Sequence, residues 1–126
     1  MKLLLDTCTL LWLITNERAL GARARTELER GDVYLSAVSS WEIAVKFAKG
    51  QLRLSQPPDW LVPAARARYG VTALPIDEES ALHVVKLPAL HADPFDRMLV
   101  CQAIVHGLTI VTPDPLITQY PARTLW

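Results

Sequence analysis

The sequence lacks several features that would assign a protein to a class at once. It has only two cysteines, Cys8 and Cys101, and neither stands at metal-ligand spacing from another Cys or His, which excludes a disulfide scaffold and a zinc-finger pattern. Its five glycines are spread singly, which excludes a glycine-rich phosphate loop. No apolar run is long enough to span a bilayer, and Asp6 and Thr7 interrupt the leucines that imitate the start of a signal peptide. We therefore expect a cytoplasmic protein with two buried, reduced thiols and no membrane partner.

The chain also lacks an excess of charge of either sign. Lys and Arg number 13 and Asp and Glu number 13, so a protein that coats nucleic acid by overall positive charge is excluded. A local basic surface is still compatible with this balance. Hydrophobic residues make up 51% of the chain and charged residues 21%, which is typical of a globular domain. With 126 residues and no repeat or linker, we expect one domain over residues 1–126.

Short apolar segments alternate with longer helical ones along the chain. Strands are predicted at residues 3–5, 33–35, 71–76 and 108–111, with a last short strand at 124–125. Helices are predicted at residues 22–30, along an apolar stripe from Trp41 to Leu52, and at 59–69, 78–85 and 95–106. A glycine follows four of these helices where each should end. The alternation predicts an α/β fold built on a parallel sheet of four to five strands.

Acidic residues stand where such a sheet forms its sites. Open parallel sheets bind ligands at the carboxyl ends of their strands. Asp6 directly follows the first predicted strand, and Asp114 follows the fourth. Glu42 comes shortly after the second strand, and Asp96 opens the helix that precedes the fourth. If these four carboxylates converge, their repulsion favours a hard cation among them, Mg²⁺ or Mn²⁺.

Each acid also has a purely structural interpretation. Ser39-Ser40-Trp41-Glu42 has the pattern of a capping box, and Glu42 precedes Lys46 by four residues, the order of a helical ion pair. Asp93 and Asp114 each precede a proline, as helix N-caps do. Asp6 fits this interpretation least, because it lies between two apolar stretches where an unpaired carboxylate is costly.

Other catalytic patterns are weak. No serine lies in a nucleophile elbow, and the three histidines share no metal-type spacing. His91 is the best exception, because it stands two residues before Asp93. Asp77 follows the third strand, but Glu78 and Glu79 come next, which is typical of an acidic helix start.

Four segments together resemble the PIN-domain family. Leu4-Leu5-Asp6-Thr7 resembles the opening strand of that family, and Ser40-Trp41-Glu42-Ile43 resembles the segment with its second acid. His-Ala-Asp-Pro-Phe-Asp-Arg-Met-Leu, residues 91–99, resembles a signature of VapC-type toxins. Thr112-Pro113-Asp114 resembles the final acidic motif. The likeness extends over nearly the whole chain, and residues 91–99 are its most specific part.

The resemblance implies a Rossmann-like, three-layer α/β/α fold and a metal-dependent ribonuclease. It implies Mg²⁺ or Mn²⁺ as cofactor, single-stranded RNA as substrate, a cognate antitoxin and a homodimer. The residues at the family's four acidic positions are Asp6, Glu42, Asp96 and Asp114. Those beside them, which would orient the ligands, are Thr7, Ser40 and Thr112, and Asp93 is a helix cap or a further supporting group.

A basic group near the acids is expected to hold RNA phosphates. With the four acids set aside, 13 − 4 = 9 acids face 13 bases in the rest of the chain. Candidate phosphate contacts are Lys46, Lys49, Arg53 and Arg97. Two alternatives stay open at this point: another metal-dependent nuclease, acting on DNA or on a particular nucleic-acid structure, and a catalytically inert α/β interaction module.

Overall fold

The computed structural model describes all residues, Met1–Trp126, and contains one five-stranded parallel sheet. Its strand order is β3-β2-β1-β4-β5. The strands are β1 (Lys2–Leu5), β2 (Asp32–Ser36), β3 (Thr72–Leu74), β4 (Thr109–Val111) and β5 (Thr124–Leu125). All five predicted strands are confirmed, with ends shifted by at most two residues.

The central strand β1 is buried on both faces of the sheet. Leu3, Leu4 and Leu5 are each fully buried, and β1 pairs with β2 on one side and β4 on the other. Because side chains alternate along a strand, Leu3 and Leu5 enter one apolar core and Leu4 enters the other. Two cores on opposite faces of one sheet confirm the three-layer α/β/α architecture.

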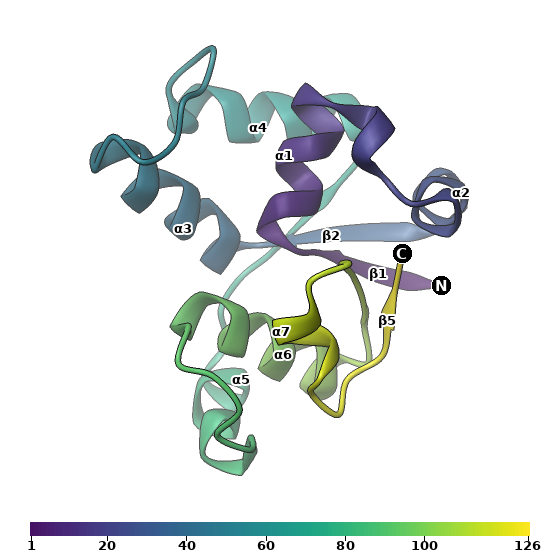
Figure 1. The fold of residues 1–126 in the computed structure, drawn as a ribbon, viewed down its shortest axis with the longest axis vertical. Helices are drawn as coiled ribbons and strands as arrows, with labels where there is room; N and C mark the ends of the chain where they lie inside the picture. Colours follow the sequence, from purple (N-terminus) through teal and green to yellow (C-terminus); the bar gives the residue numbers. More distant parts are fainter.

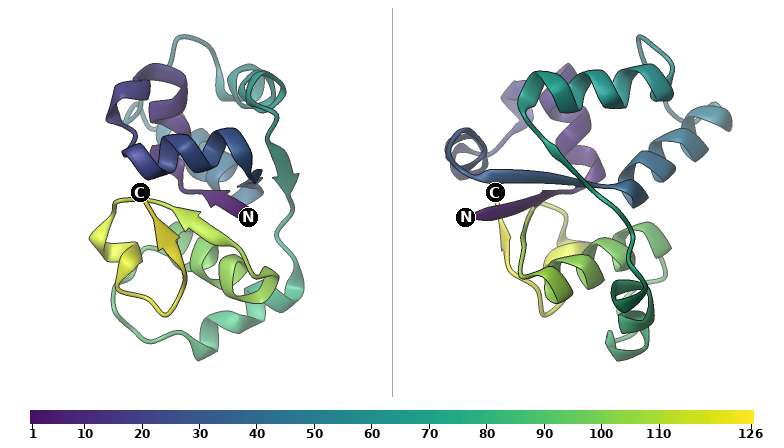
Figure 2. Two further views of the ribbon diagram at one scale, coloured as in Figure 1. Left: turned by 90° about the vertical axis from the view of Figure 1, so that its right-hand side faces the viewer. Right: turned by 180° about the vertical axis from the view of Figure 1, so that it is seen from behind.

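Helices cover both faces of the sheet and extend beyond one end of it. The helices are α1 (Thr7–Thr15), α2 (Ala22–Arg30), α3 (Ala37–Ala48), α4 (Pro58–Tyr69), α5 (Glu78–His83), α6 (Pro94–His106) and α7 (Pro115–Thr118), with 3-10 turns η1 (Glu17–Ala19) and η2 (Val84–Lys86). Helices α1, α2 and α4 lie over one face, and α5, α6 and α7 lie under the other (Figures 1 and 2). Helix α3 continues from the end of β2 and contacts α1, α4 and α6. It therefore joins the two layers at the carboxyl edge of the sheet.

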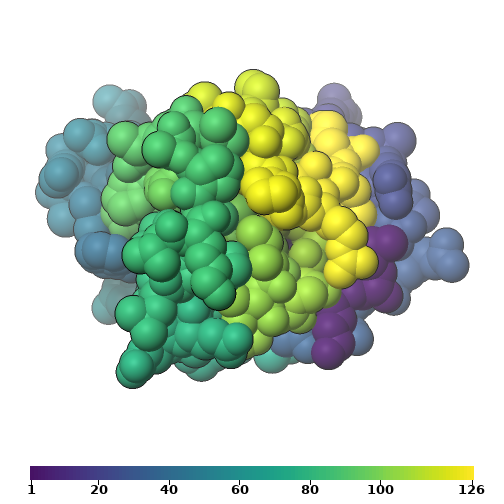
Figure 3. Space-filling model, turned by 90° about the horizontal axis from the view of Figure 1, so that it is seen from below, coloured from purple at the N-terminus to yellow at the C-terminus, as the bar shows by residue number.

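The segments after Leu74 form most of the lower face. Seen from below, the green residues of α5 and η2 and the yellow residues of the C-terminal segment lie side by side (Figure 3).

None of the helices has the length and apolar character needed to cross a membrane.

The sequence predictions miss one helix, and two of the expectations are wrong. Helix α1 was not predicted, because residues 10–14 are uniformly apolar and carry no helical period. In α3, the expected stripe does not face the core: Trp41 is 56% exposed, while Val38 and Ile43 are buried. The helix is rotated so that the polar side chains of Ser39 and Glu42 are also buried, at the carboxyl edge of the sheet. Cys8 is exposed, and only Cys101 is a buried thiol.

A buried chain of polar groups fixes the start of α3 against the lower layer. The Ser36 hydroxyl accepts a hydrogen bond from the Val38 amide at 3.0 Å and donates one to the side-chain oxygen of Gln102. The Gln102 amide group donates in turn to the Pro75 carbonyl at 2.9 Å. Ser36 and Gln102 are fully buried, so these bonds have no water to replace them.

We expect Gln102→Leu to lower the free energy of unfolding by about 1 to 3 kcal/mol, because it leaves the Ser36 hydroxyl and the Pro75 carbonyl unpaired in the interior. Urea unfolding followed by circular dichroism measures this change. Gln119→Leu is the matched control, since Gln119 is exposed, and it should stay within about 0.5 kcal/mol of the wild type. Equal stability of the two variants would contradict the argument.

Candidate active site

Four of the predicted acids meet at the carboxyl edge of the sheet. Asp6 directly follows β1, and Asp114 lies three residues beyond the end of β4. Glu42 lies in the second turn of α3. Helix α6 leads into the parallel strand β4, so its first turn, which contains Asp96, returns to the same edge. The negative charges of Asp93, Glu42 and Asp114 all help to raise the pKa of Asp96, as expected for carboxylates that share one region.

Asp6 is the most enclosed of the acids, at 3% exposure. One of its oxygens caps α1 by accepting from the Thr9 amide at 2.7 Å. The other accepts from the Thr112 hydroxyl at 2.5 Å. Burial raises the pKa of Asp6, these hydrogen bonds oppose the rise, and the charge of Asp114 adds to it. The Thr112 contact joins the residue that follows β4 to the residue that follows β1, and it fixes the orientation of the carboxylate.

Glu42 is held by a hydroxyl on one oxygen and by an ammonium on the other. Thr7 donates to its Oε1 at 2.6 Å, and Lys46 donates to its Oε2 at 2.5 Å. Glu42 is 5% exposed, whereas the Lys46 side chain is 44% exposed. The hydrogen bond to Glu42 raises the pKa of Lys46, and the charge of Asp93 contributes to the same rise. Lys46 therefore balances the acids at this edge with a charge that reaches solvent.

The carboxyl group of Asp96 has a strongly raised pKa. Burial, followed by the charges of neighbouring acids, raises its pKa to about 6, against an opposing hydrogen bond from His91. The imidazole Nε2 of His91 lies 3.1 Å from Asp96 Oδ2. A carboxylate at this position is accordingly unfavourable without a positive partner.

Asp93 and Asp114 are helix caps, as their prolines predicted. Asp93 accepts from the amides of Phe95 and Asp96 at the start of α6. Asp114 accepts from the Leu116 amide at 2.9 Å at the start of α7. Its own amide donates to the Thr112 hydroxyl at 3.0 Å, so Thr112 links Asp114 to Asp6. Asp114 is half-buried, and its capping role does not remove it from the acid cluster.

The supporting serine at this site is Ser39 rather than Ser40. Ser39 is fully buried, and its hydroxyl lies 3.0 Å from that of Thr7. Because Thr7 gives its single proton to Glu42, Ser39 is left to donate to Thr7. Ser40, one residue and about 100° further around the helix, lines a surface hollow with Pro58 and Arg66. The capping-box interpretation is wrong as well, since Ser36 caps α3.

The donor set fits a hard divalent cation. All the acids at the edge offer carboxylate oxygens. Burial, with a contribution from neighbouring negative charges, raises the pKa of Asp6 and Asp96, so a cation would favour their charged forms. No three His, Cys, Asp or Glu side chains form a ready-made cage, because the carboxylates are engaged with caps, hydroxyls, His91 and Lys46. Mg²⁺ keeps several waters and uses few direct carboxylates, so such a cage is not required.

The four predicted phosphate-binding residues differ in their surroundings. Lys49 and Arg53 are exposed at and beyond the end of α3. Lys46 is paired with Glu42. The Arg97 guanidinium donates inward, to the Pro88 carbonyl and to the Tyr120 hydroxyl at 2.9 Å each.

Sequence reasoning did not identify Tyr120, because no local pattern marks a residue that is 29 positions from its partner His91.

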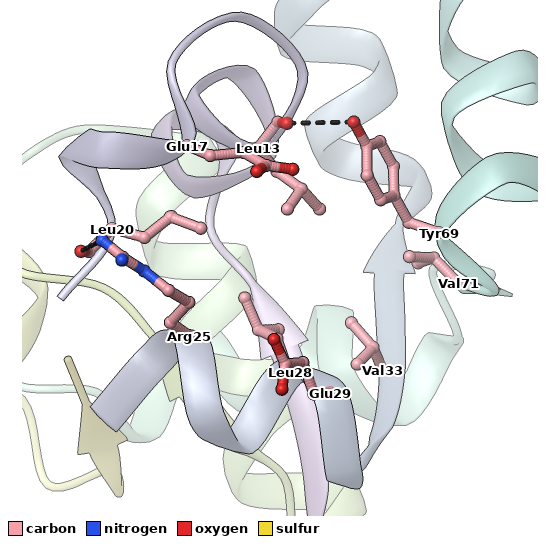
Figure 4. A pocket seen from close by; sticks show the side chains of 9 residues that line it. All are labelled: Leu13, Glu17, Leu20, Arg25, Leu28, Glu29, Val33, Tyr69 and Val71. Carbon is pink, nitrogen blue, oxygen red and sulfur yellow. Dashed lines mark hydrogen bonds between the residues drawn. The ribbon is translucent and has the colours of Figure 1, made fainter. Parts of the chain in front are cut away.

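A cavity at the opposite end of the upper layer lies away from the acids. It has a volume of about 300 Å³ and is lined by residues of α1, η1, α2, β2, the end of α4 and the segment between α4 and β3 (Figure 4). Its Val33 stands near the start of β2, whereas the acids follow the ends of strands. The Tyr69 hydroxyl donates to the Leu13 carbonyl, and the Arg25 guanidinium donates to the Leu20 carbonyl. These polar groups are therefore engaged in hydrogen bonds to the backbone. This cavity offers no catalytic arrangement.

Comparison with known proteins identifies similar sequences. Residues 3–122 match the family model described as PIN domain. Ribonuclease VapC22 of Mycobacterium tuberculosis is 31% identical over 114 residues, covering 88% of this chain and 85% of that protein. Ribonuclease VapC16 of the same organism is 34% identical over 61 residues, covering 48% of this chain and 43% of that protein.

Solved structures share the fold at low sequence identity. VapBC2 from Rickettsia felis, bound to a DNA fragment from its promoter, has a TM-score of 0.75 at 12% identity and covers 99% of this chain and 98% of that chain. DNA-bound VapBC from Salmonella typhimurium has a TM-score of 0.68 at 20% identity, with coverage of 99% and 97%. At these identities the structures establish a common fold alone.

We expect Lys46→Met to lower the free energy of unfolding in EDTA by at least about 1 kcal/mol, because the buried carboxylate of Glu42 loses its cationic partner. The double variant Glu42→Gln with Lys46→Met should recover most of this loss, since no charge is then left unpaired. Chemical unfolding of the wild type, both single variants and the double variant measures the coupling. If the change in the double variant equals the sum of the changes in the two single variants, Glu42 and Lys46 are not coupled and the prediction is contradicted.

We expect Asp96→Asn to stabilise the metal-free protein at pH 7 by about 1 to 3 kcal/mol. The folded pKa of Asp96, about 6, lies above its ordinary value of 3.8, so the folded state binds more protons between about pH 4 and 6. The free energy of unfolding therefore falls as pH rises through this window, and the variant escapes that fall. Thermal melts in EDTA at pH 4, 5, 6 and 7 measure the difference, which should vanish near pH 4.

Asp77→Asn is the control for the pH series, because its effect on stability is expected to have the opposite sign. Hydrogen bonds from His106 and Ser80 hold the pKa of Asp77 below its ordinary value, so its replacement should destabilise the protein at neutral pH. A stability gain for Asp96→Asn that does not change with pH would refute the assignment.

Proposed function

The chain belongs to the PIN-domain family, among the VapC-type ribonucleases, and from that premise we propose that it is the toxin of a toxin–antitoxin pair that hydrolyses RNA with a bound Mg²⁺ or Mn²⁺. One observation carries the metal-dependent part of this proposal. The acids Asp6, Glu42, Asp96 and Asp114 come from four separate segments and converge at one edge of the sheet, where Asp96 is electrostatically unfavourable as a carboxylate.

Asp6 and Asp96 would hold the metal, directly or through water. Asp6 is oriented by Thr112 and by the Thr9 amide, and Asp96 is oriented by His91. Asp114 and Glu42 would complete the pocket or orient the attacking water. A bound divalent ion supplies a lowered pKa for a coordinated water and offsets the negative charge that develops on the scissile phosphate.

Lys46, Lys49 and Arg53 would contact RNA phosphates beside the pocket. Lys46 stands between Glu42 and solvent, which places one positive charge next to the acids. Lys49 and Arg53 continue the same exposed end of α3. Positive charge here would offset the repulsion between an acidic pocket and the RNA backbone. Arg97 is the least suited of the predicted contacts, because its guanidinium is engaged by Pro88 and Tyr120.

A cognate antitoxin is the proposed protein partner, and a homodimer is the proposed assembly. Several structures that share this fold are complexes described as VapBC, which supports an antitoxin as the regulator of this chain. An RNA substrate and free thiols fit a reducing, cytoplasmic location.

We expect the purified chain to cleave single-stranded RNA with Mg²⁺ or Mn²⁺ and not with EDTA. Asp6→Asn and Asp96→Asn should each reduce the cleavage rate by at least about 100-fold, because either change removes a carboxylate from the pocket. The measurement is gel analysis of a panel of structured and single-stranded RNAs. Asp77→Asn, which alters an acid outside the pocket, should retain the wild-type rate.

Other outcomes identify the alternatives. Preferential cleavage of duplex or flap DNA would replace the ribonuclease by another metal-dependent nuclease. No cleavage of any substrate, together with no change in melting temperature on adding Mn²⁺, would favour an inert interaction module.

A further inference from the structure

The hydroxyl of Tyr120 lies at the centre of a hydrogen-bond chain that ends on Asp96. Tyr120 is 3% exposed and follows α7. Its oxygen accepts from the Arg97 guanidinium at 2.9 Å and from the His91 backbone amide at 3.3 Å. It also lies 2.7 Å from Nδ1 of the His91 ring. The other ring nitrogen of His91 lies 3.1 Å from Asp96 Oδ2.

These contacts determine which nitrogen of His91 carries the proton. A tyrosine hydroxyl has two lone pairs and one proton. Both lone pairs of Tyr120 are used by N–H groups that only donate, from Arg97 and from the His91 backbone. The hydroxyl proton must therefore go to Nδ1 of His91, which makes Nδ1 an acceptor. The neutral ring then carries its proton on Nε2 and donates it to Asp96.

His91 is the only side chain that holds the Asp96 carboxylate. No other side chain donates to Asp96, in contrast to Asp6, whose two oxygens are both held. The Tyr120 and His91 rings also lie against each other, with centroids 5.4 Å apart. The orientation of Asp96 thus depends on a residue that lies 24 positions further along the chain and in a different element.

We propose that Tyr120 and His91 are positioning residues of the active site. Tyr120 fixes His91 as the Nε2–H tautomer, and His91 holds Asp96 in the orientation that accepts a divalent ion. The role of Asp96 in this inference rests on the proposed function, whereas the tautomer follows from the hydrogen bonds alone. Arg97 belongs to the same unit, because it occupies the lone pair that makes Tyr120 donate to His91.

The protein contains a second His–Asp pair that serves as an internal control. His106 Nε2 lies 2.7 Å from Asp77, with the two side chains about one-third exposed. It is outside the acid cluster, so His106→Gln should not affect metal binding at the cluster.

The first test reads the tautomer directly. Two-bond ¹H–¹⁵N correlation spectra of the metal-free protein distinguish protonated from unprotonated imidazole nitrogens, and the His91 signals are assigned by their loss in His91→Gln. The wild type should show an unprotonated Nδ1 and a protonated Nε2. In Tyr120→Phe, which keeps the ring and removes the hydroxyl, His91 should show a mixture of tautomers. A protonated Nδ1 in the wild type would overturn the inference.

The second test measures Mn²⁺ affinity by isothermal titration, alongside RNA cleavage. His91→Leu should weaken Mn²⁺ binding by about 10- to 100-fold, the usual effect of removing a group that orients a metal ligand. His91→Gln should stay close to the wild type, because the glutamine amide places an N–H donor where Nε2 stood. Tyr120→Phe should weaken binding in the same direction as His91→Leu. The Tyr120→Phe and His91→Leu double variant should be no weaker than His91→Leu alone.

Asp96→Asn separates failure of this inference from failure of the proposed function. If Asp96→Asn loses Mn²⁺ binding while His91→Leu and Tyr120→Phe bind like the wild type, the positioning role is overturned and the proposed function stands. If Asp96→Asn binds Mn²⁺ and cleaves RNA like the wild type, Asp96 has no role in metal binding and the positioning role is overturned. If the wild type itself neither binds Mn²⁺ nor cleaves RNA, the proposed function fails, and the positioning role fails with it. Thermal melts of each variant confirm that the protein is folded at the assay temperature.

Discussion

Parallel pairing of β1 with β2 and β4 is the constraint on which the site depends. Because all three strands run in one direction, the residues that follow them meet at one edge. Asp6 and Asp114 arrive there from strand ends, and Glu42 arrives on the helix that leaves β2. The buried leucines of β1 hold this arrangement in place from both faces of the sheet. The apolar interior thus sets the position of carboxylates that repel one another.

The residues around the acids offset that repulsion by separate means. Hydroxyls of Thr112 and Thr7 orient Asp6 and Glu42, and the ammonium of Lys46 balances Glu42. Asp96 has only the His91 imidazole as a side-chain partner and keeps a raised pKa. The charged form of Asp96 therefore lowers the stability of the metal-free protein, first through burial and then through the nearby negative charges.

Much of this could be predicted from the sequence, since the signals are local. Short apolar strands, glycines after helices and acids before prolines predicted the sheet and the caps at Asp93 and Asp114. Contacts between distant segments could not be predicted in this way. Ser39 was missed in favour of Ser40, because the choice depends on the rotation of α3 against α1. Tyr120 was missed because its partners come from a loop and a helix that precede it by more than twenty residues.

The short helix α7 has a consequence of its own for how this protein can be inhibited. It begins at the cap Asp114, and Tyr120, two residues beyond its end, governs Asp96 through His91. A small rotation of this one segment would misalign two of the acids together, although no ligand had entered the pocket. Leu116, in the same helix, is 49% exposed, so this segment can be reached from solvent. A molecule that displaced this segment would therefore disturb the pocket without entering it.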